Sequence, residues 1–187
     1  YTKKRISAKF PRLEERIQVL NNCLDPLFEA PAGFEKPENL VHRYGIWPGE
    51  KVILTLCRLS SSEKYKGYDH VIEALSGIKN RNWKYLLMGK YDEGEKERIE
   101  HLLEASGLED KVILTGFIPD EEITAHFRLG DLFIMPSTDE GFGIVFIEAA
   151  AWGLPLIAGN KDGSSDALLN GELGSLINPD SIAEIQQ

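Results

Sequence analysis

The fold is decided by residues 51–88, KVILTLCRLSSSEKYKGYDHVIEALSGIKNRNWKYLLM, in which two short apolar runs flank an amphipathic stretch. The first run, Val52–Cys57, is rich in β-branched residues and predicts a strand. Apolar side chains then recur at helical spacing in Tyr68–Ile78, which predicts a helix, and Trp83–Met88 predicts a second strand. Strands that alternate with helices in this way are typical of a parallel sheet wound with helices.

The same alternation continues along the rest of the chain. Helices are predicted at Glu93–Ser106, Asp120–Leu129, Phe142–Trp152 and Asp166–Leu169, and strands at Val112–Thr115, Leu132–Met135, Leu156–Ala158 and Gly174–Ile177. We expect Gly107 to end the first of these helices in a left-handed conformation and Asp120 to cap the second. The predicted fold class is therefore α/β with a doubly wound parallel sheet. Ligands of such sheets bind beyond the carboxyl ends of the strands, in the strand-to-helix loops.

The first fifty residues show little periodicity. Scattered prolines and basic residues surround a turn-like cluster at residues 21–26, and a short helix is expected within residues 37–45. We interpret residues 1–50 as a connector and residues 51–187 as one folded domain. The chain begins without methionine and its last seven residues resemble the opening of a longer helix, so we expect it to be a fragment.

The composition is that of an acidic protein with enough apolar residues for a core. The chain has 187 residues, 42% hydrophobic content, a formal net charge of -9 and a pI near 5.0. Nucleic acid is not an expected partner, because phosphate neutralisation needs a basic surface. No apolar run approaches the ~18 residues of a membrane span. Cys23 and Cys57 match no metal or redox spacing, so we expect a cytoplasmic protein in which Cys57 packs as a small apolar residue.

Positive charges follow the first predicted strand. The loop at residues 58–67, RLSSSEKYKG, carries Arg58 and Lys66 in an otherwise acidic chain. Arginine can donate two parallel hydrogen bonds to phosphate oxygens and lysine supplies a point charge, so the two side chains suit a diphosphate. Gly67 lets the backbone turn nearby. From this segment alone, a solvated basic loop before a helix is an equally good interpretation.

The most informative stretch is STDEGFGIVFIE, residues 137–148. Gly141 and Gly143 lie at the predicted start of a helix, where free backbone N–H groups and the positive end of the helix dipole bind phosphates or sugar hydroxyls. Glu140 directly precedes them. These residues predict a second binding loop beside the first.

Glu148 lies further along the same helix among apolar residues. An unpaired carboxylate is costly in such surroundings. A ribose diol offers two hydroxyl donors to its two oxygens, which is the role of acidic residues in dinucleotide sites. The alternative is an exposed helix glutamate, and we favour the ribose contact because charged groups are seldom buried without a partner.

Arg58, Lys66 and the E-x(7)-E spacing of Glu140 and Glu148 resemble the motifs of the group 1 glycosyltransferases of the GT-B fold, the retaining enzymes of family 4. The resemblance implies that residues 51–187 form a Rossmann-like nucleotide-sugar-binding domain, which is one half of a GT-B enzyme.

The resemblance also implies roles for the matching residues. Arg58 and Lys66 are expected to contact the donor diphosphate and Glu140 to contact hydroxyls of the donor sugar, so these three are the candidate catalytic residues. Glu148 is expected to bind the ribose. The other candidate donor-binding residues are Gly89, Ile118, Gly141, Phe142, Gly143 and Ile144, with Ile118 in the loop that commonly reads the nucleobase.

The resemblance extends from about residue 21 to residue 180 and includes two departures from the family pattern. Cys23 stands where an interdomain element usually has glycine. Tyr91 stands where a Gly-x-Gly turn usually has its second glycine, which weakens the case for close backbone approach to a ligand there. Residues 160–164, NKDGS, resemble the loop that faces the interdomain cleft.

The resemblance implies that an N-terminal domain, which we expect this chain to lack, supplies the acceptor site. The expected partner is a nucleotide-sugar donor, and peripheral membrane association is expected only through the missing half. Sugar transfer by this chain alone is expected to be absent or weak. We expect no cofactor and no metal ion, since no Asp-x-Asp pair accompanies the phosphate loop. His42, His70, His101 and His126 are interpreted as structural, because none neighbours a nucleophile in sequence.

Two other functions remain open from the sequence. One is a different GT-B enzyme, such as a nucleotide-sugar epimerase or a phosphorylase that uses pyridoxal phosphate. The other is a noncatalytic module that binds a nucleotide for regulation or binds another protein.

Overall fold

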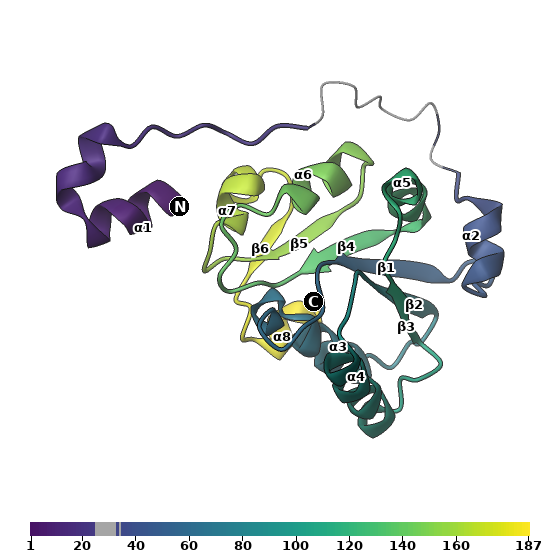
Figure 1. Ribbon diagram of the computed structural model, residues 1–187. Helices are drawn as coiled ribbons and strands as arrows, with labels where there is room; N and C mark the ends of the chain where they lie inside the picture. Colours follow the sequence, from purple (N-terminus) through teal and green to yellow (C-terminus); the bar gives the residue numbers. More distant parts are fainter. Residues whose placement is uncertain (25–32, 34) are drawn as a thin grey trace.

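The computed structural model describes residues 1–24, 33 and 35–187. In these residues it contains a six-stranded sheet with the order β3-β2-β1-β4-β5-β6, and every neighbouring pair of strands runs parallel (Figure 1). The strands are β1 (Lys51–Leu56), β2 (Trp83–Met88), β3 (Val112–Gly116), β4 (Leu132–Met135), β5 (Leu156–Gly159) and β6 (Ser175–Ile177). The strand order reverses direction between β1 and β4, which confirms the predicted doubly wound α/β fold.

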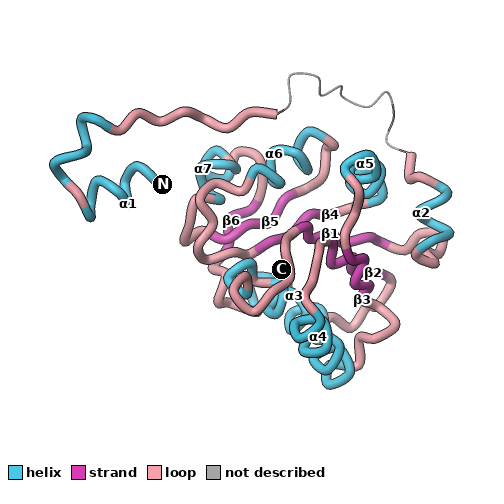
Figure 2. The backbone as a smooth tube through the Cα atoms, in the orientation of Figure 1, coloured by secondary structure: helices cyan, strands magenta, loops and turns pink. Residues whose placement is uncertain are grey.

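Helices cover both faces of the sheet. They are α3 (Tyr68–Ser76), α4 (Glu93–Ser106), α5 (Asp120–Leu129), α6 (Ile144–Ala151), α7 (Ser164–Ala167) and α8 (Ile182–Ile185). Helices α3, α4 and α8 pack on one face, whereas α5, α6 and α7 pack on the other. Figure 2 shows the strands side by side between these two layers of helices.

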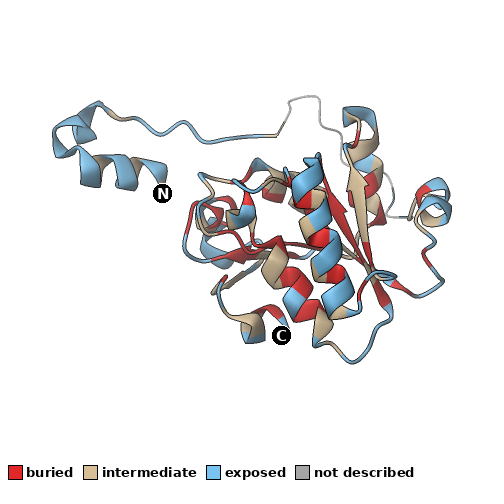
Figure 3. Ribbon diagram, turned by 60° about the horizontal axis from the view of Figure 1, so that its bottom comes forward, coloured by how far each residue is buried: buried red, intermediate tan, exposed pale blue. Residues whose placement is uncertain are grey.

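The apolar core has two halves, one on each face of the sheet. In β2, Leu86 and Met88 join the half under α5 and α6, whereas Tyr85 and Leu87 join the half under α3 and α4. Side chains of a strand alternate between faces, so this strand is buried on both sides, as parallel strands usually are. The helices turn buried residues toward the sheet and exposed residues outward (Figure 3).

Most predicted helix ends are correct to within two residues, and the differences have local causes. Asp120 does not cap α5: Pro119 occupies the N-cap and no side-chain cap bond forms, so Asp120 lies in the first turn, where its charge favours the helix dipole. Gly107 ends α4 in the left-handed conformation, as predicted. Helix α6 begins at Ile144 because Gly143, at the N-cap, has a φ of 83°. The last predicted helix begins two residues early, at Ser164.

The N-terminal segment contains α1 (Thr2–Lys9), a 3₁₀ helix at Pro11–Arg16, and α2 (Glu38–Arg43). The first two were not predicted, whereas α2 lies within the expected 37–45 window. The predicted turn-like cluster at residues 21–26 falls partly outside the described residues. Across the described part of the chain, no helix is long and apolar enough to cross a membrane.

Helix α2 is joined to α5 by polar contacts. The Tyr44 hydroxyl lies 2.8 Å from Nε2 of His126, and Nδ1 of His126 lies 2.7 Å from the carbonyl oxygen of Glu122. His126 is 1% exposed, and burial lowers its pKa. Both ring nitrogens are therefore engaged in hydrogen bonds within the protein, which agrees with the structural interpretation of this histidine.

Candidate functional site

The site forms where the loops after β1, β4 and β5 meet. Strands β1 and β4 are neighbours at the reversal of strand order, and β5 follows β4 in the sheet. The carboxyl ends of parallel strands share one edge, so the three loops are brought to the same place. The two loops predicted from sequence, residues 58–67 and 137–148, are therefore adjacent in the fold.

Lys66 and Glu140 are in direct contact. The Nζ atom of Lys66 lies 2.5 Å from Oε2 of Glu140, and the two side chains are only 14% and 17% exposed. Burial lowers the pKa of Lys66, but the hydrogen bond to Glu140 raises it further, so the net pKa lies above the ordinary lysine value. Lys66 therefore carries its charge at neutral pH, beside a carboxylate from a loop 74 residues away in sequence.

Arg58 lies at the start of the loop after β1, and its side chain faces solvent. Its side chain is 79% exposed, and its Nη2 donates to Oε1 of Glu63 over 2.6 Å. Glu63 is 8% exposed, and its other oxygen accepts the hydroxyl of Tyr65 at 2.8 Å. The sequence analysis did not identify Glu63 as the ion-pair partner of Arg58. The available signal was that Glu63 is the only acidic residue between the two cations.

Gly89 joins the loops after β1 and β2. Its φ is 136°, and a Cβ atom at this position would lie 1.8 Å from the carbonyl oxygen of Cys57. Its N–H donates to the carbonyl oxygen of Gly116 over 3.1 Å. The structure thus explains the glycine by close backbone packing, and the contact of Gly89 with a donor stays a prediction.

Helix α6 begins with a series of consecutive backbone N–H groups. Within the described residues, the N–H groups of Gly141, Phe142, Gly143 and Ile144 donate to no protein acceptor. Unpaired N–H groups at a helix N-terminus bind anions and hydroxyl oxygens. The predicted helix-start site therefore has the donors that it requires.

Glu148 has the environment that the sequence predicted. Its side chain is half-buried, and within the described residues it makes neither a hydrogen bond nor an ion pair. Burial raises its pKa above the ordinary glutamate value. It is a carboxylate that has no partner among the described residues and can accept ligand hydroxyls.

The loop after β3 contains the residue expected near the nucleobase. Ile118 is 6% exposed, and its neighbour Phe117 is 71% exposed. The ring of Tyr91 lies against Gly116. A Cβ atom added at Gly116 would lie 3.7 Å from the ring, at ordinary van der Waals distance. Tyr91 thus fills space between the loops after β2 and β3 where the family usually has glycine.

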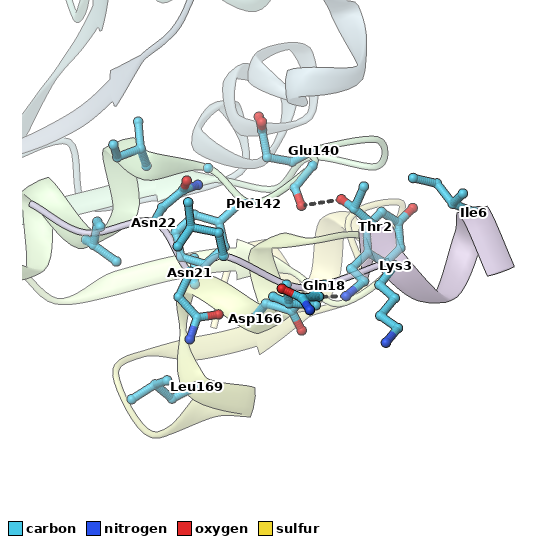
Figure 4. Close-up of a pocket in the computed structure, with 18 of the residues that line it drawn as sticks. Thr2, Lys3, Ile6, Gln18, Asn21, Asn22, Glu140, Phe142, Asp166 and Leu169 are labelled. Carbon is cyan, nitrogen blue, oxygen red and sulfur yellow. Dashed lines mark hydrogen bonds and ion pairs between the residues drawn. The ribbon is translucent and has the colours of Figure 1, made fainter. Parts of the chain in front are cut away.

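A hollow of about 1050 Å³ lies between the α6 loop and the N-terminal segment (Figure 4). Residues 140–144 line one side of it, and residues 1–3 and 17–22 line the other. The Thr2 hydroxyl donates to the carbonyl oxygen of Gly141 over 3.2 Å. Five predicted site residues therefore share this hollow, while the other five, Arg58, Lys66, Gly89, Ile118 and Glu148, do not line it.

Metal-binding clusters and reactive thiols were the other candidate features of the site. In the part of the chain that the structure describes, no three His, Cys, Asp or Glu side chains are grouped to hold a metal ion. Burial raises the pKa of the Cys57 thiol to about 12. The thiol is therefore protonated at neutral pH, in keeping with its prediction as a packing residue.

The family model described as glycosyl transferases group 1 matches residues 38–187. The chain belongs to this family. The match begins at the start of α2 and covers all six strands of the sheet. This confirms the family resemblance, which the sequence motifs had predicted.

Named relatives agree with this membership. An uncharacterised glycosyltransferase of Methanocaldococcus jannaschii is 29% identical over 97% of this chain and 46% of its own length. A GDP-mannose-dependent phosphatidylinositol monomannoside mannosyltransferase of Mycolicibacterium smegmatis is 32% identical over 72% of this chain and 36% of its own length. The chain thus spans less than half the length of these group 1 relatives.

Solved structures show the same fold. HepE from Anabaena, crystallised with UDP and glucose, matches 79% of this chain and 40% of its own chain, with a TM-score of 0.68 and 28% identity. A glycosyltransferase from Rickettsia africae matches 80% of this chain and 39% of its own, with a TM-score of 0.73 and 26% identity. The chain therefore has the Rossmann-like α/β fold of one half of a GT-B glycosyltransferase, as predicted.

Proposed function

We propose that this chain is the donor-binding half of a retaining glycosyltransferase, which transfers a sugar from a nucleoside-diphosphate sugar to an acceptor hydroxyl. The proposal is carried by the contact of Lys66 with Glu140 at the reversal of strand order, beside the free N–H groups that begin α6. A cation, a carboxylate and free N–H donors are the groups that a sugar diphosphate requires. The structure of HepE with UDP and glucose supports the same donor class.

Each part of the donor has a candidate partner. The diphosphate lies between Arg58 and Lys66, the donor sugar meets Glu140 and the N–H groups of residues 141–144, and the ribose hydroxyls meet the unpaired carboxylate of Glu148. The nucleobase lies along the loop of Ile118, and Gly89 is a further donor contact. Glu148 is half-buried and has no partner in the described part of the chain, which supports this assignment, because ligand hydroxyls would supply the missing donors.

The chemistry follows from charge. As the bond from the anomeric carbon to the diphosphate breaks, negative charge develops on the leaving diphosphate. Arg58, Lys66 and the N-terminus of α6 stabilise that charge through groups already in place. Lys66 pairs with Glu140 in the structure, so donor binding exchanges this carboxylate for a phosphate oxygen. Two fixed cations supply the neutralisation, and we propose that neither a metal ion nor a cofactor is required.

The remaining features of the whole protein are also proposals. The acceptor binds to residues outside this chain, and the chain alone transfers little or no sugar. Any contact with a membrane surface is made by that other half. A cytoplasmic location is supported by the two cysteines, which are both free. The net charge of -9 argues against nucleic acid as a partner.

Replacing Lys66 with methionine tests the diphosphate assignment. Because Lys66 would contact the terminal phosphate, the variant should lose about tenfold or more in affinity for nucleoside diphosphates, the scale of one charged hydrogen bond. Nucleoside monophosphates, which lack that phosphate, should bind almost unchanged. Titration calorimetry with UDP, UMP, GDP and GMP measures both affinities.

Lys64→Met is the matched control, because Lys64 is exposed and lies two residues away in the same loop. It should leave both affinities unchanged. An equal loss of monophosphate and diphosphate binding in Lys66→Met would place Lys66 away from the terminal phosphate and would contradict the assignment.

A further inference from the structure

Asp162 is a buried carboxylate that links two loops of the site. It follows β5, is 3% exposed, and lies in the 160–164 loop. Its Oδ2 accepts the N–H of Glu140 and the hydroxyl of Ser137, both at 2.7 Å. Its Oδ1 accepts the N–H of Ser164 at 2.9 Å. Three donors from two segments therefore converge on one side chain.

The backbones of the two loops are also in close contact. The N–H of Gly163 donates to the carbonyl oxygen of Glu140 over 2.8 Å. A Cβ atom at Gly163 would lie 2.1 Å from the carbonyl oxygen of Gly141 and 2.7 Å from that of Glu140. The 160–164 loop thus hydrogen-bonds both the backbone N–H and the backbone carbonyl oxygen of Glu140.

These contacts fix where the free donors begin. Because the N–H of Glu140 donates to Asp162, the first backbone N–H without an acceptor among the described residues is that of Gly141. The side chain of Glu140 is directed from the same peptide toward Lys66. A shift of the Glu140 backbone would therefore move the Glu140 carboxylate and the N–H of Gly141 together.

We propose that Asp162 is a positioning residue for the donor sugar, acting through the backbone of Glu140 and Gly141. The inference rests on the proposed function. It predicts a selective effect: the groups assigned to the sugar, the Glu140 carboxylate and the N–H of Gly141, move when Asp162 is lost. Arg58 lies on the loop after β1. Glu148 lies further along, inside α6, which is held on the sheet by the buried side chains of Phe146 and Ala149, so it stays in place. Asp162 therefore governs the part of the affinity that the sugar contributes.

Asp162→Asn tests this selectivity in the 187-residue chain. Asparagine keeps one acceptor oxygen and places an NH₂ group where the other oxygen was, facing an N–H donor. Calorimetric affinities should be measured for UDP with UDP-glucose and for GDP with GDP-mannose. In the pair that binds, the variant should lose about tenfold in affinity for the sugar nucleotide, the scale of one lost hydrogen bond to a charged group. Affinity for the free diphosphate should change by less than about twofold, as for independent sites.

Gly163→Ala provides a second route, because it keeps Asp162 and pushes the Glu140–Gly141 backbone with an added methyl group. It should produce the same selective loss. Asp180→Asn is the control: Asp180 is exposed and pairs with Lys161, away from Glu140. Equal losses for diphosphate and sugar nucleotide, or no loss, in Asp162→Asn would overturn the inference. Failure of the unsubstituted chain to bind these four nucleotides and also ADP and ADP-glucose, measured in the same way, would instead refute the proposed function, and the inference with it.

Discussion

Replacing Glu148 with glutamine should weaken nucleoside diphosphate binding about a hundredfold, because two hydrogen bonds from ribose hydroxyls to a charged acceptor are each worth roughly 1.5–3 kcal/mol. The half-buried carboxylate has no partner among the described residues, so ligand hydroxyls are its natural donors. Glutamine keeps the shape and one acceptor but removes the charge. Titration calorimetry with UDP, GDP and ADP measures the loss.

The same substitution should make the unbound chain more stable at neutral pH. Burial raises the pKa of Glu148 in the folded state, so ionisation is disfavoured by folding. The stability contributed by this group is complete below the unfolded pKa of about 4.3 and is lost as the pH rises through the raised folded pKa. Glu148→Gln avoids that loss. Its advantage in the free energy of unfolding should therefore be absent at low pH and grow toward neutrality.

Glu97→Gln is the matched control, because Glu97 is an exposed glutamate on α4. It should change neither nucleotide affinity nor the pH dependence of stability. The ribose assignment fails if Glu148→Gln binds diphosphates as tightly as the unsubstituted chain. A variant that is both weaker in binding and less stable would show that Glu148 has a protein partner.

Replacing Gly89 with alanine should destabilise the fold by about 3–4 kcal/mol, the range of overpacking combined with backbone strain. The added Cβ would lie 1.8 Å from the carbonyl oxygen of Cys57, and that oxygen belongs to the backbone and cannot rotate away. The φ of 136° adds to the cost. Urea unfolding followed by circular dichroism measures the change.

Gly107→Ala separates backbone conformation from packing. Gly107 also has a positive φ, of 61°, but nothing lies within 4 Å of its added Cβ. It should cost only about 1 kcal/mol. Equal destabilisation by the two variants would mean that the loops after β1 and β2 are not packed as tightly as the structure shows.

The strands of the sheet were predictable because each one has its own local sequence pattern. β2 and β4 begin and end at the predicted residues, since apolar runs of strand length lie between turn residues and charged helices. The first fifty residues were less predictable. Helix α1 buries no residue, so it has no apolar face for a periodicity argument to detect.

The site was predictable only in part. Glu140 and Glu148 are recognisable from their spacing, and Lys66 from its charge after a strand. The roles of Glu63 and Asp162 depend on contacts made after folding. Asp162 meets Glu140 from 22 residues away, and an aspartate in a glycine- and serine-containing loop is more often a turn residue. Long-range hydrogen bonds of this kind leave no local pattern in sequence.

The most direct test of the donor-binding assignment is thermal unfolding of the chain with saturating UDP, GDP and ADP. A diphosphate at a hundred times its dissociation constant adds about 2.7 kcal/mol of stability, which corresponds to roughly 5–10 °C in Tm for a domain of this size. The donor-site assignment predicts such a rise with one of the three diphosphates and its loss in Glu148→Gln. An unchanged Tm with all three, at concentrations up to several millimolar, would contradict it.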